Sequence, residues 1–282
     1  MSATTVTSPR GTVAPPRRSL GSALADAWAI TGRNVIVYRR VPTLVVFTLI
    51  QPVVFVLLFR YVFGGAIRVP GGIPYVDYLM PGIFVQTVAF GATNTAIGLA
   101  TDVKSGLLER FHSLPMARSA VLTGRTFADL GRNVLVVAIM AIVGFAVGFR
   151  VQTNVAGFVA GVLLVLLFAY AFSWVFATVG LAIGDPESAQ AATFPVLAPI
   201  VFASSVFVPV STMPSWLRGW ATYQPVSVTA NAARALMLGG PTLSWVLQSV
   251  GWCAAIVAIC APPRPAPRRS PRPAFVAPFR AA

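Results

Sequence analysis

The sequence predicts an all-α integral membrane protein with six transmembrane helices. Hydrophobic residues make up 56% of the 282 residues and charged residues only 10%, whereas soluble domains carry about 25% charged residues. Six apolar stretches approach the ~20 residues with which a helix crosses the hydrocarbon core of a bilayer. They are residues 43–63, 82–100, 134–149, 155–183, 190–210 and 242–260. This composition argues against a soluble enzyme.

The positive charges predict how these helices are oriented. The chain has 21 Lys and Arg against 7 Asp and Glu, a net charge of +14. If the N-terminus is cytoplasmic, six spans return the C-terminus to the same side, and sixteen of the 21 cations then lie in cytoplasmic segments. Cytoplasmic loops carry such an excess of Lys and Arg. The sequence therefore predicts an N-in, C-in multi-pass protein of the plasma membrane, in contact with lipid. The excess of basic residues is explained by this orientation, and no nucleic-acid partner is predicted.

All but one of the cations are arginine, since Lys104 is the single lysine. We interpret this bias as the codon usage of a GC-rich bacterial genome. Residues 1–19 are predicted to be a disordered tail. Residues 20–40 are predicted to form an amphipathic helix at the inner membrane surface, because Leu20, Leu24, Trp28 and Val35 recur at near-helical spacing.

Residues 41–260 form the predicted six-helix transmembrane domain. It contains one sizeable cytoplasmic loop, 101–132, and an outer segment, 211–241. The outer segment is predicted to hold a helix near 227–238 that ends at Gly239-Gly240-Pro241. The last 22 residues, 261–282, contain seven prolines and five arginines and cannot form a packed helix. They are either a disordered tail or the product of a frameshift.

The predicted spans contain no Asp, Glu, Lys or His. Ion-coupled carriers usually place ionisable groups at mid-membrane, so the energy for any transport is expected from elsewhere. The chain also has no phosphate-binding loop, because Gly124-Arg125-Thr126 lacks the leading glycine and the lysine of that motif. With one histidine, His112, and two cysteines on one apolar stretch, the sequence predicts no catalytic, cofactor-binding or metal-binding residue in this chain.

Neutral polar residues interrupt several spans, most of all the second. They either line a path for substrate or form hydrogen bonds between helices, which are worth about 1–2 kcal/mol or less. The candidates for the substrate path are Gln51, Gln86, Thr87, Thr93, Asn94, Ser204 and Ser205.

The cytoplasmic loop predicts a docking element. Leu107, Leu108 and Phe111 form a short apolar stripe beside Glu109 and Arg110. Pro115 ends this predicted helix, because proline cannot continue it. Exposed apolar residues next to mixed charges favour contact with a soluble partner over a merely solvated loop.

The loop also carries a family resemblance. Leu-Glu-Arg-Phe-His-Ser-Leu-Pro-Met-Ala-Arg-Ser at 108–119 and Gly-Arg-Thr-Phe-Ala-Asp-Leu at 124–130 resemble the ABC type-2 permease family, in particular its daunorubicin-resistance exporter branch. The resemblance extends to Gln51-Pro52, Tyr-Leu-Met-Pro-Gly at 78–82, Gln-Pro-Val-Ser-Val at 224–228 and Ala-Arg-Ala at 233–235. It covers roughly residues 20–255.

The resemblance implies a function and a set of partners. In that family two permease subunits pair with two separate ATP-binding subunits, which use ATP and Mg, while the permease itself binds no cofactor. The permeases here would form a homodimer or pair with a second permease, and would export a drug-like or amphipathic substrate. Residues 211–241 would form re-entrant helices on the outer side. A coupling helix at about 107–115 would contact the ATPase through Glu109, Arg110, Phe111, Leu114 and Pro115.

Two alternatives from other classes remain at this stage. One is a membrane-embedded transferase or hydrolase, for which only Asp102, Asp185 and Glu187 are candidate acids at a membrane boundary. The other is a membrane protein that binds an ATPase without transporting anything. The identity of the substrate cannot be read from the sequence.

Overall fold

The structure, a computed structural model, describes residues 42–67, 69, 71–106 and 118–260. These residues form eight α-helices and no strand, so the all-α prediction is confirmed for this part of the chain. The helices are α2 (Pro42–Leu57), α3 (Tyr75–Lys104), α5 (Arg118–Val147), α6 (Val155–Ile183), α7 (Pro186–Phe202), α8 (Ser215–Tyr223), α9 (Pro225–Leu238) and α10 (Thr242–Cys260). A π-helical segment, η1 (Leu58–Phe63), continues α2, and a 3-10 turn, η2 (Val210–Thr212), precedes α8.

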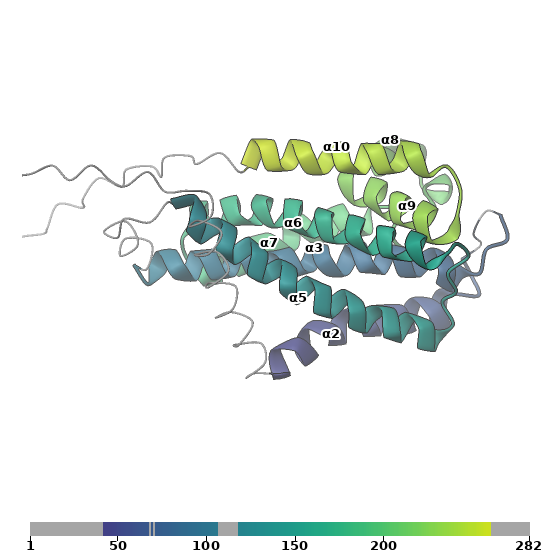
Figure 1. The fold of residues 1–282 in the computed structure, drawn as a ribbon, viewed down its shortest axis with the longest axis horizontal. Helices are drawn as coiled ribbons and strands as arrows, with labels where there is room; N and C mark the ends of the chain where they lie inside the picture. The colour runs from purple at the N-terminus through teal and green to yellow at the C-terminus, as the bar shows by residue number, and fades with distance from the viewer. Residues whose placement is uncertain (1–41, 68, 70, 107–117, 261–282) are drawn as a thin grey trace, which may run out of the picture.

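Helix α3 lies at the centre of the bundle. It packs against α5, α6, α7 and α9, and most of its residues are buried. The long helices run along the length of the molecule, while α8 and α9 gather at one end (Figure 1). We call that end, where α3 begins at Tyr75, the outer end, and the end at Lys104 the inner end, after the predicted topology.

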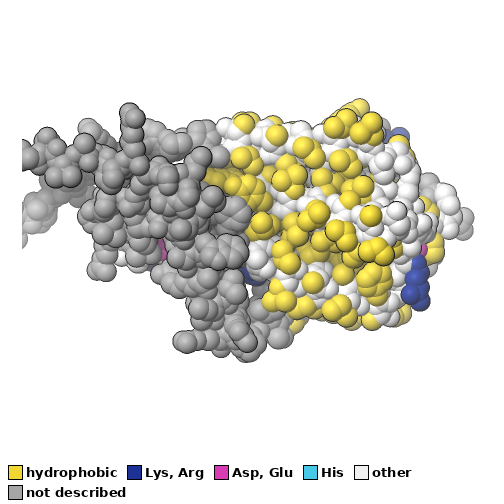
Figure 2. Space-filling view, in the orientation of Figure 1, with side chains coloured by type: hydrophobic (Ala, Val, Ile, Leu, Met, Phe, Trp, Pro, Cys, Tyr) yellow, Lys and Arg dark blue, Asp and Glu magenta, His cyan; other side chains and the backbone are white. Residues whose placement is uncertain are grey.

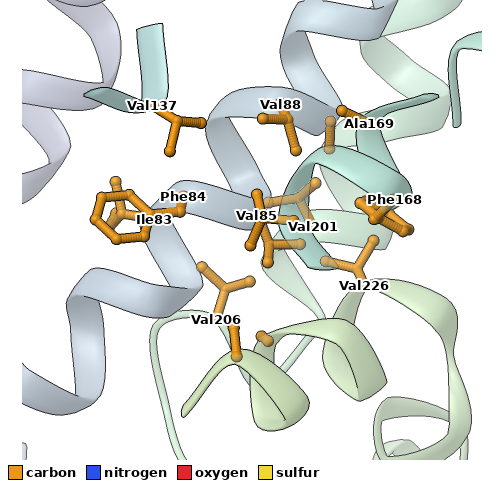
Figure 3. Close-up of a cluster of buried hydrophobic side chains, with 14 of the residues drawn as sticks. Ile83, Phe84, Val85, Val88, Val137, Phe168, Ala169, Val201, Val206 and Val226 are labelled. Carbon is orange, nitrogen blue, oxygen red and sulfur yellow. The ribbon is translucent and has the colours of Figure 1, made fainter. Parts of the chain in front are cut away.

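The core forms where α5, α6, α7 and α9 meet α3. Side chains of α3 lie among those of its neighbours in the close-up of Figure 3. They are Ile83, Phe84, Val85 and Val88 of α3, Val137 of α5, Phe168 and Ala169 of α6, Val201 of α7, Val206, and Val226 of α9. Because lipid tails are as apolar as these side chains, close packing holds such helices together more than removal from water does.

Glycines allow the closest approaches between helices. A Cβ atom built at Gly157 of α6 would lie 2.6 Å from the carbonyl oxygen of Leu236 on α9. One built at Gly180 would lie 2.8 Å from Cα of Ala96 on α3, and closer still to its carbonyl oxygen. Both distances are shorter than real Cβ contacts, so α6 packs backbone to backbone against α9 at one end and α3 at the other.

Among the described residues, four helical segments are long and apolar enough to cross a membrane: Tyr75–Lys104, Asp129–Val147, Val155–Ile183 and Thr242–Cys260. The predicted bounds 155–183 and 242–260 are confirmed. For α6 the reason is local: the Asn154 side chain accepts a hydrogen bond from the Gly157 amide at 2.8 Å, and Gly184 ends the helix in the left-handed conformation. The first and fifth predicted spans are shorter helices, so six spans stay a prediction.

Three predicted spans have the wrong bounds. The second, 82–100, lies within the longer α3, and the third, 134–149, lies almost wholly in α5, which begins at Arg118. The fifth, 190–210, overlaps α7, which ends at Phe202. Asp77 and Asp129 lie outside the predicted spans but inside helical segments that are long and apolar enough to cross a membrane. Hydropathy treats such residues as boundaries, whereas the structure buries both of them against neighbouring helices.

The outside of the bundle is largely apolar. In Figure 2 hydrophobic side chains are spread over the middle of the visible face, with Lys and Arg at one end. Exposed examples are Ile142 on α5, Leu163 on α6, Val196 on α7 and Leu247 on α10. Such a surface suits contact with lipid, and with the apolar helices it indicates a multi-pass membrane protein.

Several predicted segments lie outside the described residues. They are the tail 1–19, the interface helix 20–40, the loop residues 107–117 and the C-terminal segment 261–282. The predicted helix near 227–238 lies within the described part and is confirmed as α9, which ends before Gly239 at φ 93°. Cys253 and Cys260 on α10 are both free thiols.

Candidate functional site

At the outer end, a buried arginine joins three segments. Arg234 of α9 is only 7% exposed. Its Nε donates a hydrogen bond to the Tyr78 carbonyl at 2.8 Å, and its Nη2 donates to the carbonyls of Ser205 at 2.6 Å and Val206 at 2.9 Å. Its Nη1 donates to Asn231 Oδ1 at 2.8 Å and to Ser205 Oγ at 3.3 Å. The bonds thereby connect α3, α9 and the segment that follows α7.

We call Tyr75, Tyr78, Ser205, Asn231 and Arg234 the outer cluster. The Tyr78 ring lies under the guanidinium, with Cζ 3.7 Å from the ring centroid, which favours a cation. The Tyr78 and Tyr75 hydroxyls donate to backbone carbonyls of the same segment after α7, each at 2.8 Å. All five guanidinium donors are used, and each of their acceptors is neutral. Arg234 therefore holds the fold together and has no donor left for a ligand.

The outer cluster unites motifs that lie far apart in the sequence. Tyr78 begins the 78–82 motif, and a Cβ built at Gly82 would lie 2.6 Å from the Val206 carbonyl oxygen. Gln224 begins the 224–228 motif and donates from Nε2 to the carbonyls of Ile200 and Ala203, both at 3.0 Å. Arg234 is the centre of the 233–235 motif. These motifs are visible in the sequence, but only the fold shows the partners of Arg234 and hence its role.

A cavity of about 610 Å³ lies next to the outer cluster. Its wall includes Tyr78, Ser205, Thr222, Asn231, Arg234 and Trp245, and most of the remaining lining is apolar. A mostly apolar cavity with a few polar groups is typical of sites for small organic molecules. Ser205 is the single predicted path residue in its wall.

The predicted path residues do not form one site. The hydroxyls of Thr87 and Thr93 donate to carbonyls of their own helix, Ile83 at 2.7 Å and Phe90 at 2.7 Å, and Asn94 donates to Gly91 at 3.2 Å. Ser204 likewise bonds to Val201. Ser205 belongs to the outer cluster, Gln86 is buried in α3, and Gln51 is exposed on α2. No hydrogen bond among described residues joins two of the seven, and their role in transport stays a prediction.

At the inner half of the bundle, α3 and α5 share a buried polar contact. Thr95 Oγ1 donates to Asp129 Oδ2 at 2.6 Å, and Arg132 Nη2 donates to the Gly91 carbonyl at 2.6 Å. Asp129, Arg132 and Thr95 are all buried. Both Asp129 and Arg132 fall at the end of the predicted cytoplasmic loop, 101–132, so the sequence gives no sign that they are buried against α3.

At the inner end, an ion pair closes the contact between α3 and the turn before α7. Lys104 Nζ lies 2.8 Å from Asp185 Oδ1. The Asp185 side chain also caps α7, accepting bonds from the Ser188 amide and hydroxyl, each at 2.9 Å. The hydrogen bond from Lys104, and then those from Ser188, lower the pKa of Asp185 to about 2. The residues predicted to contact an ATPase, Glu109, Arg110, Phe111, Leu114 and Pro115, lie outside the described residues.

Comparison with known proteins agrees with the resemblance seen in the sequence. The family model described as ABC-2 type transporter matches residues 25–238. The chain is 31% identical over 226 residues to the daunorubicin resistance ABC transporter permease protein DrrB1 of Streptomyces coeruleorubidus, covering 80% of this chain and 78% of that protein. It is 26% identical over 219 residues to a probable doxorubicin resistance ABC transporter permease protein, DrrC, of Mycobacterium tuberculosis strain CDC 1551 / Oshkosh, covering 78% and 79%.

The matched region runs from before α2 through α9 and so contains the central helix, the inner contact and the outer cluster. The family named from the sequence motifs is confirmed. The chain belongs to the ABC-2 type transporter family.

Proposed function

We propose that this chain is the membrane-spanning permease subunit of an ABC exporter that moves drug-like, amphipathic molecules out of the cell. The observation that carries the proposal is the family match over residues 25–238, together with relatives named for daunorubicin and doxorubicin resistance. The apolar helices and the apolar cavity at the outer end suit such a substrate. The match favours export over the two alternatives, a membrane-embedded enzyme or a non-transporting partner of an ATPase.

A separate subunit supplies the energy in this proposal. The sequence has no phosphate-binding loop, and permeases of ABC transporters work with an ATP-binding partner. We infer an assembly of two permease chains and two ATP-binding subunits that hydrolyse Mg-ATP, in the plasma membrane of a bacterium with a GC-rich genome. The permease chains form a homodimer, with six spans each and both termini in the cytoplasm.

Export is tested by reconstituting the chain with its ATP-binding subunit in inverted membrane vesicles. Vesicles with both subunits are expected to accumulate daunorubicin or doxorubicin with ATP, and not with a non-hydrolysable analogue. Vesicles with either subunit alone are the control. Equal accumulation in all three kinds of vesicle would refute drug export by this chain.

The predicted ATPase contact needs its own variant. Glu109→Ala is expected to lower drug-stimulated ATPase activity or assembly of the complex, because Glu109 lies in the predicted coupling helix. Glu187→Ala is the matched control, since Glu187 is an exposed acid at the inner end of the bundle on a different turn. If Glu109→Ala behaves like Glu187→Ala, the assignment of Glu109 is wrong.

A further inference from the structure

The inner half of α3 is attached to α5, to α6 and to the turn before α7 by three different kinds of contact. Thr95 and Gly91 bond to α5, Ala96 packs on Gly180 of α6, and Lys104 pairs with the turn before α7. We call this stretch of α3, residues 91–104, the inner node. Residues 107–117, which carry the predicted ATPase contact, join the inner node to α5 in the sequence.

The bonds to α5 are specific in geometry. Gly91 and Thr95 lie one turn apart on the same face of α3. Asp129 and Arg132 lie three residues apart on the same face of α5, and these two faces are in contact. A hydroxyl that donates to a carboxylate at 2.6 Å forms a strong, charge-assisted bond. Gly91 is needed for the approach, because a Cβ there would lie 3.0 Å from Asn133 Oδ1 and 3.2 Å from Arg132 Nη2.

Charged groups buried at this depth are costly. Asp129 begins the segment of α5 that is long and apolar enough to cross a membrane, where charged side chains are rare and usually functional. Two apolar helices could pack here without Asp129 and Arg132, as the remainder of their contact does. A pair of polar contacts fixes the register of the two helices, which apolar packing alone leaves freer to slide.

The other end of α3 reaches the outer cavity. Its first turns carry Tyr75 and Tyr78, and Tyr78 lines the cavity and bonds Arg234 through its carbonyl. A helix of 30 residues is about 45 Å long at ~1.5 Å rise per residue. One continuous helix thus connects the residues next to the predicted ATPase contact to the wall of the outer cavity.

We propose that the Thr95–Asp129 contact is a positioning device that makes α3 and α5 move as one body, so that ATP binding at the inner end changes the outer cavity. This inference rests on the proposed function, in that it requires an ATP-binding partner. Without the contact, α3 and α5 slide past each other and the displacement is lost between them. Thr95 and Asp129 act through the helices and touch no substrate.

The test measures the outer cavity without using any drug. Thr222 lines the cavity, so Thr222→Cys reports on it through its rate of reaction with a maleimide, scored on the permease band of a gel. The native thiols do not interfere, because Cys253 is buried and Cys260 is replaced by Ser. The rate is measured in the assembled complex with its ATP-binding subunit, with and without ATP.

The reference complex is expected to change its labelling rate on ATP binding. Thr95→Val keeps the shape of the side chain and removes its donor, and is expected to reduce this change about fivefold or more. Thr95→Ser keeps the donor and is expected to behave as the reference. Thr101→Val is the matched control on the same helix, because the Thr101 hydroxyl bonds to its own helix at Ile97. Basal ATPase activity and assembly are expected to stay unchanged in all three variants.

Two results would overturn the proposal. One is a full ATP-dependent change in the Thr95→Val complex, and the other is the absence of any such change in the reference complex. If Thr95→Val does not accumulate in the membrane, Gly91→Ala tests the same α3–α5 interface one turn away, where Arg132 bonds to Gly91, and a full change in that complex is equally contrary. Because this labelling experiment uses no drug, its outcome can be interpreted even if the chain is found not to export drugs.

Discussion

At the scale of single residues, the most constrained side chain described is Arg234. A buried guanidinium keeps its charge only when its hydrogen bonds replace those it makes with water. Here five neutral acceptors do so, three of them backbone carbonyls that no substitution of their own side chains can remove. Arginine is required because its planar fork reaches acceptors on three segments at once.

Arg234→Lys is therefore expected to destabilise the protein although the charge is kept. A lysine has three donors on one atom and leaves buried carbonyls unpaired, at a cost of ~2–4 kcal/mol in the free energy of unfolding. The measurement is denaturant unfolding of the purified protein in detergent. Arg218→Lys is the control: Arg218 also donates to two carbonyls, of Ser211 and Met213, but is exposed, and a change within about 0.5 kcal/mol is expected. Equal losses in the two variants would contradict the role given to Arg234.

The residues of the candidate site could be predicted from the sequence only in part. The motifs at 78–82, 224–228 and 233–235 are visible in the chain, but their contacts join positions up to 156 residues apart. Nothing in local spacing indicates that Arg234 donates to the Tyr78 carbonyl. The partners of Arg234 are mostly backbone carbonyls, and because every residue has a backbone carbonyl, the sequence does not indicate which ones accept these hydrogen bonds.

At the scale of helices, contact between backbones matters most at Gly180. Gly180→Ala is expected to push α6 away from Ala96 and to cost ~1–3 kcal/mol, as overpacking does. Gly251→Ala on α10 is the matched control, because a Cβ there meets no atom within 4 Å; it is expected to be neutral or slightly stabilising. Thermal unfolding of the two variants side by side measures the difference, and equal melting temperatures would refute the close approach.

The ion pair between α3 and the turn before α7 predicts a pH dependence. The pKa of Asp185 is about 2 in the folded protein, against an ordinary value of 3.8. A carboxyl with a lowered pKa stabilises the fold above the ordinary value, and this contribution is lost as the pH falls from about 4 to about 2. Asp185→Asn keeps a cap residue for α7 and removes the charge, so thermal stability is expected to fall less steeply over this range than in the parent. Identical slopes would show that the pair contributes nothing.

The sequence predicted helices best where their ends are marked by local chemistry. α6 has Asn154 before it and Gly184 after it, and its bounds were predicted to the residue. α5 was predicted too short, because Asp129 and Arg132 resemble the residues of a loop until α3 is seen to bury them. Hydropathy depends only on the composition of a segment, so it cannot indicate that polar residues of α5 are buried against a neighbouring helix.

At the scale of the whole molecule, the predicted topology has a direct test. With six spans and a cytoplasmic N-terminus, Ser215 at the start of α8 faces the outside and Glu187 in the first turn of α7 faces the cytoplasm. Both residues are exposed. In intact cells, Ser215→Cys is expected to react with a membrane-impermeant maleimide, and Glu187→Cys only after permeabilisation. If only Glu187→Cys is labelled in intact cells, the orientation of the protein in the membrane is the reverse of the predicted one.

The arrangement of the outer cluster also has a consequence for biosynthesis. Arg234 is added to the chain 156 residues after Tyr78, which at ~5–20 residues per second takes roughly 10–30 s. During that interval α3 is already complete, while the carbonyl that it offers to Arg234 waits for its donor. The bonds that join α3 to α9 and to the segment after α7 therefore form only after α9 has been synthesised, and a chain that stops before Arg234 lacks the side chain that joins these three segments.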